Sequence, residues 1–236
     1  MSTDFPVKDI VPVHKRAIHS FVKRKGRQSD RQKQALQQYW PEYGIEYSNA
    51  LLDFSQLFPD LSVVKLEIGF GNGESLVQMA KLDDSSGYIG IEVHTPGVGN
   101  CLNLIHDQQL SNLGLMTHDA IEVLQSMIPP NSLSAVFLFF PDPWHKKRHN
   151  KRRIVNNVFK DLLIKVLKPG AVLHMATDWQ DYAEHMAQEM LADSRFRNLG
   201  NELGYSEKPD YRPITKFERR GLRLGHGVWD LMFEKR

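Results

Sequence analysis

From residue 63 onward, short apolar runs alternate with longer stretches in which apolar residues recur every three or four positions. The first run, VVKLEIGFGNG, ends in glycines, and Leu76, Met79 and Ala80 follow it at helical spacing. Short apolar runs indicate buried strands, whereas the amphipathic stretches indicate helices. The later runs predict strands at 88–93, 113–119, 134–142, 171–178 and 228–235. The stretches between them predict helices at 96–109, 120–128, 151–167 and 180–192.

Strands that alternate with helices predict an α/β domain with a mainly parallel sheet. The run at 134–142 is the most apolar, so we expect it at the centre of the sheet. Residues 228–235 are expected to form a final edge strand, and the KPG sequence at 168–170 predicts a turn before the fifth strand.

The N-terminal segment has a different composition from the rest of the chain. Residues 1–33 are polar and basic, and they carry too little apolar surface to fold alone. We predict a flexible basic arm at 1–33 and a single folded domain at 34–236. The arm is either a solvated tail or a segment that neutralises phosphates.

Composition narrows the class of protein further. The chain has 236 residues, of which 41% are hydrophobic and 25% charged, which suits one globular domain. Cys101 is the only cysteine, which excludes an intramolecular disulfide and a thiolate-rich metal site. No apolar run approaches the roughly 18–20 residues of a membrane span. The start, MSTDFPVKDI, has an acid and a proline where a secretory signal is apolar, so we expect a cytoplasmic protein without a membrane anchor.

Five predicted strands in succession finish at or beside an acidic residue. Ligands of open α/β sheets bind beyond the carboxyl ends of the strands, so these acids are candidate ligand contacts. The alternative is that they cap the helices that follow, and this alternative is strongest for Asp119 and Asp178. The five acids are Glu67, Glu92, Asp119, Asp142 and Asp178.

A glycine-rich turn follows the first strand. Its glycines, Gly69, Gly71 and Gly73, permit close approach of a ligand, although their spacing departs from the dinucleotide fingerprint by one residue. Glu92 lies about 20 residues on, where an acid accepts hydrogen bonds from ribose hydroxyls. A cleft entrance lined with acidic side chains repels a pyrophosphate. It suits S-adenosylmethionine, which has an ammonium, a sulfonium, ribose hydroxyls and an adenine amino group.

The segment FFPDPWHKKRHNKRRI, residues 139–154, places one acid between two prolines and then six cations with no acid among them. Such a cluster predicts contact with RNA phosphates, and the alternative is a solvated helix start. Trp144 either stacks on a base or packs internally. His145 and His149 lie four apart, but no third ligand accompanies them, so we expect no metal site.

These motifs together resemble the bacterial tRNA (guanine-N7)-methyltransferase family. The resemblance rests on residues 139–154, on EIGFGNG at 67–73, on GIEVHTPGVG at 90–99, on HMATDW at 174–179 and on RPITKFERRGLRLGHGVWDLMFE at 212–234. It implies a Rossmann-like class I methyltransferase fold, with a seven-stranded, mostly parallel sheet, helices on both faces and an antiparallel strand near the edge. It also implies transfer of a methyl group from S-adenosylmethionine to guanosine 46 in the tRNA variable loop.

The resemblance also implies roles for individual residues. Asp142 is expected to be catalytic, and the contacts to S-adenosylmethionine are expected from Glu67, Glu92, Asp119 and Asp142. Contacts to the substrate are expected from Lys146, Asp178, Thr215, Lys216, Phe217 and Glu218. The segment expected to contact RNA holds Arg148, Lys151, Arg152 and Arg153.

Chemistry refines the expected role of Asp142. Guanine N7 carries a lone pair and no proton, so its methylation needs positioning and charge stabilisation rather than a base. Asp142 therefore has an orienting and electrostatic role, and the flanking prolines fix its backbone. The irregular stretch at 215–230 is interpreted as a lid over the guanine, with a plain surface loop as the alternative.

Three other functions are weighed against this prediction. PDPW resembles the motif of enzymes that methylate exocyclic amines, which is the first alternative. The second is a non-catalytic RNA-binding protein on the same fold. A nicotinamide dehydrogenase is disfavoured by the glycine spacing and the acidic cleft entrance. We expect tRNA as the partner, and a monomer rather than a homodimer.

Overall fold

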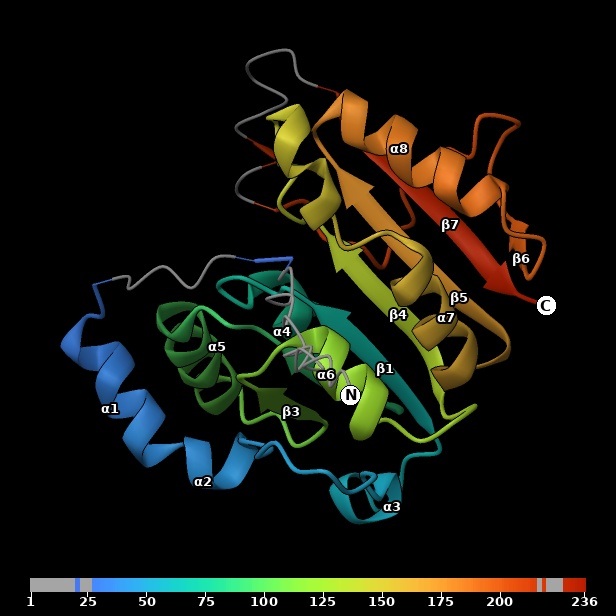
Figure 1. The fold of residues 1–236 in the computed structure, drawn as a ribbon. Helices are drawn as coiled ribbons and strands as arrows, with labels where there is room; N and C mark the ends of the chain where they lie inside the picture. The colour runs from blue at the N-terminus through green and yellow to red at the C-terminus, as the bar shows by residue number, and fades with distance from the viewer. Residues whose placement is uncertain (1–19, 22–26, 216–217, 220–226) are drawn as a thin grey trace, which may run out of the picture.

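The centre of the molecule is a twisted sheet that the computed structural model places between two layers of helices (Figure 1). The structure describes residues 20–21, 27–215, 218–219 and 227–236. Within these ranges the sheet has seven strands in the order β3-β2-β1-β4-β5-β7-β6. The strands are β1 Val63–Ile68, β2 Ser86–Ile91, β3 Leu113–Met116, β4 Leu133–Phe139, β5 Leu167–Thr177, β6 Phe196–Asn198 and β7 Trp229–Lys235. The first five are parallel, and β7 runs antiparallel to both of its neighbours.

Helices cover both faces because side chains alternate along each strand. On β4, Phe137 and Phe139 face one core and Val136 and Leu138 face the other. The first core is closed by α1 Asp30–Gln38, α4 Glu74–Leu82 and α5 Thr95–Asp107. The second core is closed by α6 Ala120–Ser126, α7 Asn157–Val166 and α8 Gln180–Leu191. Short helices α2 Trp40–Tyr43 and α3 Phe54–Leu57 lead into β1.

The predicted sheet is confirmed, with one correction at its edge. The seven strands, the antiparallel strand and the central place of β4 all agree with the prediction. However, β7 is not an edge strand, because the three-residue β6 pairs with its outer side. So short a strand leaves almost no alternating pattern in the sequence, which is why it was not predicted.

The basic segment also folds differently from the prediction. A helix was expected from residue 151, but α7 begins at Asn157, where the Asn156 side chain caps it by accepting from Phe159 N at 3.2 Å. Most of the cations before it lie in a separate 3-10 helix, η1 Lys147–Arg152. They therefore do not oppose the dipole of α7, as cations in its first turn would.

The predicted boundary after residue 33 is wrong by a few residues. Ser29 and Gln32 form a reciprocal capping box, so α1 begins at Asp30. Ala35 is buried against α5, and Arg31 pairs with Asp107 at 3.0 Å. Residues 30–33 thus belong to the folded domain. The flexibility predicted for the preceding arm falls mostly on positions outside the described residues.

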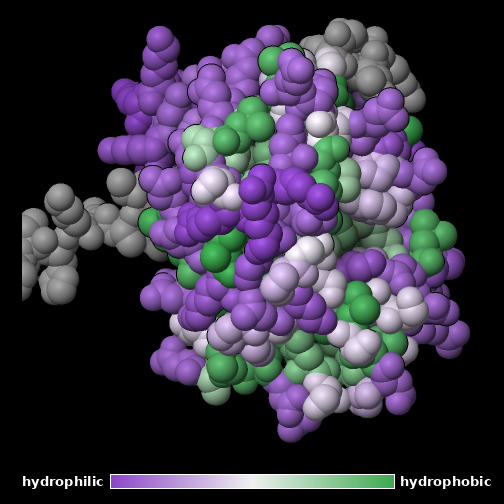
Figure 2. Space-filling model, turned by 90° about the vertical axis from the view of Figure 1, so that its right-hand side faces the viewer, coloured by the Kyte–Doolittle hydropathy of each residue, from purple (hydrophilic) through white to green (hydrophobic). Residues whose placement is uncertain are grey.

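One face of the surface is mainly hydrophilic, and its hydrophobic side chains form small separate groups (Figure 2). In the part of the chain that the structure describes, no helix is long and apolar enough to cross a membrane.

Candidate active site and nucleic-acid interface

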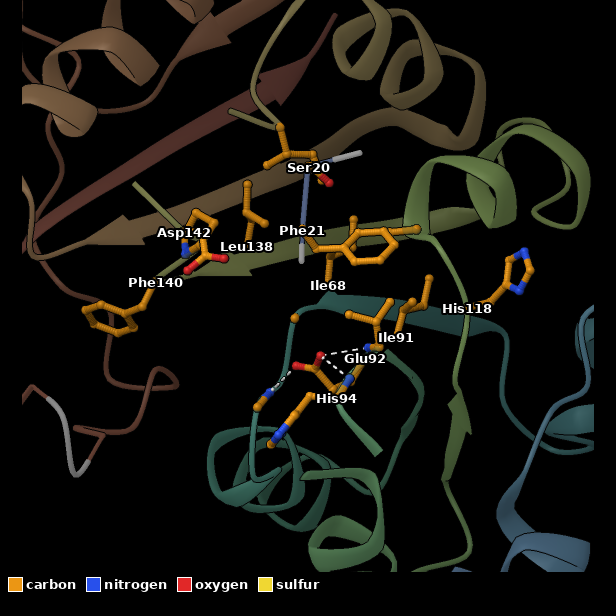
Figure 3. Close-up of a pocket in the computed structure, with 16 residues that line it drawn as sticks. Ser20, Phe21, Ile68, Ile91, Glu92, His94, His118, Leu138, Phe140 and Asp142 are labelled. Atoms are coloured by element: carbon orange, nitrogen blue, oxygen red, sulfur yellow. Dashed lines mark hydrogen bonds between the residues drawn. The ribbon is translucent and has the colours of Figure 1, made fainter. Parts of the chain in front are cut away.

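A cleft of about 400 Å³ opens at the carboxyl ends of β1, β2 and β4 (Figure 3). It brings together four of the predicted cofactor residues, Gly69, Gly71, Glu92 and Asp142. Asp142 comes from the segment after β4 and Glu92 from the residue after β2. These two carboxylates lie on different walls of one cleft, as the strand-end argument predicts.

The glycine turn between β1 and α4 needs glycine for its backbone conformation. Gly69, Gly71 and Gly73 have φ values of 76°, 58° and 82°, in the left-handed region. A Cβ at Gly69 or Gly71 would meet no atom within 4 Å, so these two residues border open space. Gly73 differs, because a Cβ there would meet the Cys101 side chain at 2.3 Å. Gly73 therefore allows α4 and α5 to pack closely and does not line the cleft.

The Glu92 carboxylate organises the turn. Its Oε2 accepts from Gly71 N at 2.9 Å, and its Oε1 accepts from Val93 N at 2.7 Å and His94 N at 2.9 Å. A carboxylate has about four acceptor positions, so three backbone donors leave capacity for a further donor. Because Glu92 also lines the cleft, that donor can come from a ligand.

Glu67 lies behind the cleft rather than in it. Its side chain is only 2% exposed, and its Oε2 has no hydrogen-bond partner in the structure. Burial, and then the nearby charge of Glu92, raises the pKa of Glu67 to about 8. Burial therefore favours the protonated form of Glu67. A buried carboxyl oxygen without a partner is costly, so this oxygen is a candidate hydrogen-bond partner for a polar group of a ligand.

Asp119 acts as a helix cap in this structure. It is the N-cap of α6, and its Oδ1 accepts from Ile121 N at 2.9 Å. Its neighbours His118 and Ala120 line the cleft, whereas Asp119 lies on the adjoining surface hollow. Asp119 therefore has the position of a helix cap, which is the alternative that the sequence analysis gave for it.

The backbone around Asp142 is held in an unusual conformation. Phe140 has φ 51° and donates its N–H to Ala176 O of β5 at 2.7 Å, and Trp144 also has φ 51°. Together with Pro141 and Pro143, these turns leave the segment few alternatives. The exposed Asp142 side chain is thereby directed toward the cleft.

Trp144 is already engaged within the protein. Its Nε1 donates to Ser20 O at 3.1 Å, and the Arg152 guanidinium lies 4.9 Å from its ring centroid. The His149 ring meets it edge-on at 5.9 Å. Ser20 and Phe21 line the cleft, so a short piece of the predicted N-terminal arm lies against it.

The basic cluster divides into exposed and buried members. Lys146, Arg148 and Lys151 are exposed. Arg153 is 4% exposed, donates to Pro143 O at 3.0 Å and pairs with Asp181. Its guanidinium is therefore committed to the fold, in contrast to the RNA contact expected from the sequence. Partial burial, and then the charges of Arg148 and Arg152, lowers the pKa of His149, which is consistent with a positive surface.

A buried charge cluster lies next to the end of β4, where Arg212 meets the rings of Phe139 and Phe140. Arg212 is 1% exposed and binds two carboxylates, Asp230 at 2.6 and 2.8 Å and Glu218 at 2.8 and 2.9 Å. Thr215 completes it, because its hydroxyl accepts from Glu218 N at 3.1 Å. Glu218, expected to bind substrate, is thus buried against Arg212 in this structure. Lys216 and Phe217, the other two residues expected there, lie outside the described residues.

His174 extends this charge cluster into the sheet. Its Nε2 donates to Asp230 Oδ1 at 2.8 Å, and its Nδ1 accepts from the Tyr211 hydroxyl at 2.8 Å. Burial lowers the pKa of His174, so the neutral ring matches these two bonds. Burial alone would raise the pKa of Asp230, but the hydrogen bonds from His174 and Arg212 hold it below its usual value.

Sequence reasoning missed several cleft residues. His94 and His118 line the cleft next to predicted acids, and Phe140 and Ile154 line it around the basic segment. Only their position in the sequence could have identified them, because each lies one or two residues from a strand end or from a residue predicted to contact a ligand. Within the described residues, no group of three His, Cys, Asp or Glu side chains is placed to hold a metal ion.

Comparison with known proteins assigns the family. A family model described as "Putative methyltransferase" matches residues 61–231. The tRNA (guanine-N(7)-)-methyltransferase of Salmonella choleraesuis (strain SC-B67) is 56% identical over 220 residues, 93% of this chain and 92% of that protein. The enzyme of the same name from Yersinia pseudotuberculosis serotype I (strain IP32953) is 57% identical over 221 residues, 94% of this chain and 92% of that protein.

The chain belongs to the tRNA (guanine-N(7)-)-methyltransferase family. The solved structure of an antibiotic-related methyltransferase has a TM-score of 0.51 and 17% identity, and it covers 79% of this chain and 97% of its own. This likeness shows the class I methyltransferase fold alone.

The cofactor of this methyltransferase is S-adenosylmethionine, as predicted. The cleft fits such a group on three observations. Its volume is that of a small-molecule pocket, Gly69 and Gly71 border open space, and a Glu67 oxygen beside the turn has no partner.

Proposed function

We propose that this methyltransferase transfers the methyl group of S-adenosylmethionine to N7 of guanosine 46 in the tRNA variable loop. The observation that carries the proposal is the position of Asp142. It lies in the same cleft as Glu92 and the glycine turn, and the exposed cations Lys146, Arg148 and Lys151 follow it within nine residues. One carboxylate therefore stands between a cofactor site and a surface for phosphates.

The environment of each residue indicates its role in binding the cofactor or in methyl transfer. Glu92 and the backbone at Gly69 and Gly71 would hold the cofactor, with Glu67 behind them. Bound S-adenosylmethionine supplies an electrophilic methyl group on a cationic sulfur. Asp142 stabilises the positive charge that the purine gains, and it accepts from guanine N–H groups to orient the base. No residue has to remove a proton, because N7 carries none.

The substrate side is assigned to exposed residues. Asp178 and Lys146 follow β5 and β4 at the end of the sheet that holds the cleft, and Arg148 and Lys151 would position phosphates. Thr215 and Glu218 fix the segment beyond Arg212 to the sheet. We also propose that one chain forms the complete site, that the protein is a monomer, and that it acts in the cytoplasm on tRNA.

The decisive experiment is methyl transfer to unmodified total tRNA with labelled S-adenosylmethionine, followed by nucleoside analysis. We expect N7-methylguanosine as the labelled nucleoside and guanosine 46 as the mapped position. A label on adenine N6 or another exocyclic amine would refute the N7 assignment. Binding of tRNA without binding of the cofactor would refute the enzymatic assignment.

The exposed cations give a second prediction. Replacing Arg148 and Lys151 with alanine is expected to weaken tRNA binding and to reduce the slope of log K against log salt by about 1–2, because each lost phosphate contact removes about 0.7–0.9. The slope is measured by filter binding at several salt concentrations.

The control for this prediction replaces Lys81 and Arg236 with alanine. Both are exposed. Lys81 lies in the last turn of α4 and Arg236 directly follows β7, at the far end of the sheet from the cleft. The two variants have the same net charge, so equal slopes in both would contradict a local phosphate surface.

A further inference from the structure

Two aromatic side chains meet outside the cofactor cleft, at the end of the sheet where β4 and β5 finish. Trp179 comes two residues after β5, and His145 comes six residues after β4. Their rings approach edge to face, with centroids 4.2 Å apart and planes inclined at 77°. Trp179 is 41% exposed, and His145 is exposed. We call this pair the aromatic step.

The aromatic step is not part of the hydrophobic core. Trp179 packs into neither of the two core clusters, whereas Trp40 and Trp229 are packed against them. Its backbone N–H donates to Thr177 Oγ1 at 3.3 Å, and its residue precedes α8 as the N-cap. The backbone is thus fixed while the ring faces solvent. A single exposed apolar side chain needs no explanation by itself, so the argument depends on what surrounds it.

The surroundings of the aromatic step are those of a nucleic-acid surface. Asp178 lies directly before Trp179, and Lys146 lies directly after His145, and both are exposed. Phe140 and Ala176 are joined by a backbone hydrogen bond, so the chain segments that carry Asp142 and Trp179 leave the sheet side by side. An aromatic face next to cations is the usual arrangement for holding unpaired bases.

Trp144 does not offer the same opportunity. It is half-buried, its N–H is used by Ser20 O, and Arg152 covers part of its ring. Of the two tryptophans that follow β4 and β5, Trp179 is the one whose side chain is exposed to solvent.

We propose that Trp179, supported by His145, stacks on an unpaired nucleobase of the RNA substrate. The proposal rests on the proposed function, because it assumes that tRNA lies across the end of the sheet near Asp142. Stacking needs only the flat face of a base, so the aromatic step holds a base without reading its identity. It thereby complements Asp142, which faces the edge of the guanine.

The test compares Trp179→Ala, Trp179→Phe and the wild-type enzyme. Loss of stacking on one base is expected to reduce kcat/KM for tRNA by about 5- to 150-fold, and phenylalanine is expected to restore most of it. If the target guanine stacks on Trp179, kcat falls. If a neighbouring base stacks there, KM rises with kcat unchanged. The cofactor Kd from calorimetry and the Tm are expected to match those of the wild-type enzyme.

Two further measurements keep the test independent of turnover. Addition of tRNA is expected to quench tryptophan emission in the wild-type protein, and Trp179→Phe removes most of that quenching. The control is Leu203→Ala, which removes another exposed apolar side chain. Leu203 is 67% exposed and lies in the segment before β7, which begins at Trp229. This variant is expected to change neither kcat/KM nor the quenching.

Unchanged kcat/KM in Trp179→Ala together with unchanged quenching in Trp179→Phe would refute the proposal that Trp179 stacks on a base. A lost activity that accompanies a lower Tm and is not restored by phenylalanine would also overturn it, since Trp179 would then be structural. If the wild-type enzyme fails to methylate tRNA, the proposed function is refuted. The quenching experiment still shows whether Trp179 contacts the RNA.

Discussion

Replacing Asp142 with alanine is expected to lower kcat for tRNA methylation by about 100- to 1,000-fold and to leave the Kd for tRNA nearly unchanged. The reason is the placement of a single charge. Asp142 lines the cofactor cleft, and its backbone is fixed by two prolines and by the left-handed turn at Phe140. The purine gains positive charge only as the methyl bond forms. A carboxylate placed beside it therefore stabilises the transition state more than the bound substrate.

Single-turnover kinetics at saturating tRNA and cofactor measures this effect. Asp142→Asn separates charge from shape, because the amide keeps the size and one acceptor oxygen but has no negative charge. We expect Asn to lose most of what Ala loses. The matched control is Asp84→Ala, which removes an exposed acid before β2 at the other end of the sheet and should leave kcat unchanged. Near-normal turnover in Asp142→Ala would remove this residue from its proposed role.

The fold could be predicted largely from periodicity, because parallel strands are buried on both faces. The run of β4 is apolar over nearly its whole length and stands out from the polar turns, and β2 is buried along its whole length. The missed elements carry no such pattern. β6 has three residues, and α1 has one fully buried residue, Ala35, so each depends on contacts that are distant in sequence.

The site was predictable wherever backbone topology alone decides position. Glu92 and Asp142 follow strands that share one end of the sheet, so their meeting in one cleft follows from parallel pairing. Burial was not predictable in the same way. Arg148 and Arg153 stand in one basic run, yet Arg148 is exposed and Arg153 is buried beside Asp181. That difference depends on α8, which comes nearly 30 residues later in the chain.

The burial of the Arg212 cluster could not be predicted from the sequence either. The sequence placed Glu218 on a lid over the substrate, whereas its carboxylate is 4% exposed and bound to Arg212. Arg212 also lies 5.9 and 5.7 Å from the rings of Phe139 and Phe140, just before Asp142. One guanidinium therefore connects β7, the segment at Thr215 and the strand end that leads to Asp142.

Replacing Arg212 with methionine is expected to lower the free energy of unfolding by about 3–5 kcal/mol, because it leaves the buried carboxylates of Glu218 and Asp230 without their partner. Urea unfolding at pH 7 measures the change. Arg197→Met is the matched control. Its ion pair with Glu234 at 2.8 Å has a side chain that is 59% exposed, so its loss should cost at most about 1 kcal/mol. Combining Arg212→Met with Glu218→Gln and Asp230→Asn should recover part of the loss.

The pH dependence of the Arg212→Met effect distinguishes lost pairing from lost packing. The pKa of Asp230 is held below its ordinary value of 3.8 in the folded protein, so its ion pair stabilises the fold above that pH and is lost as the pH falls through the folded-state pKa. The gap between wild type and Arg212→Met should therefore narrow in acid. A gap that stays constant from pH 7 down to the acid transition would assign the effect to the lost arginine side-chain volume. A loss at pH 7 no larger than that of Arg197→Met would show that the buried pair does not hold this part of the fold together.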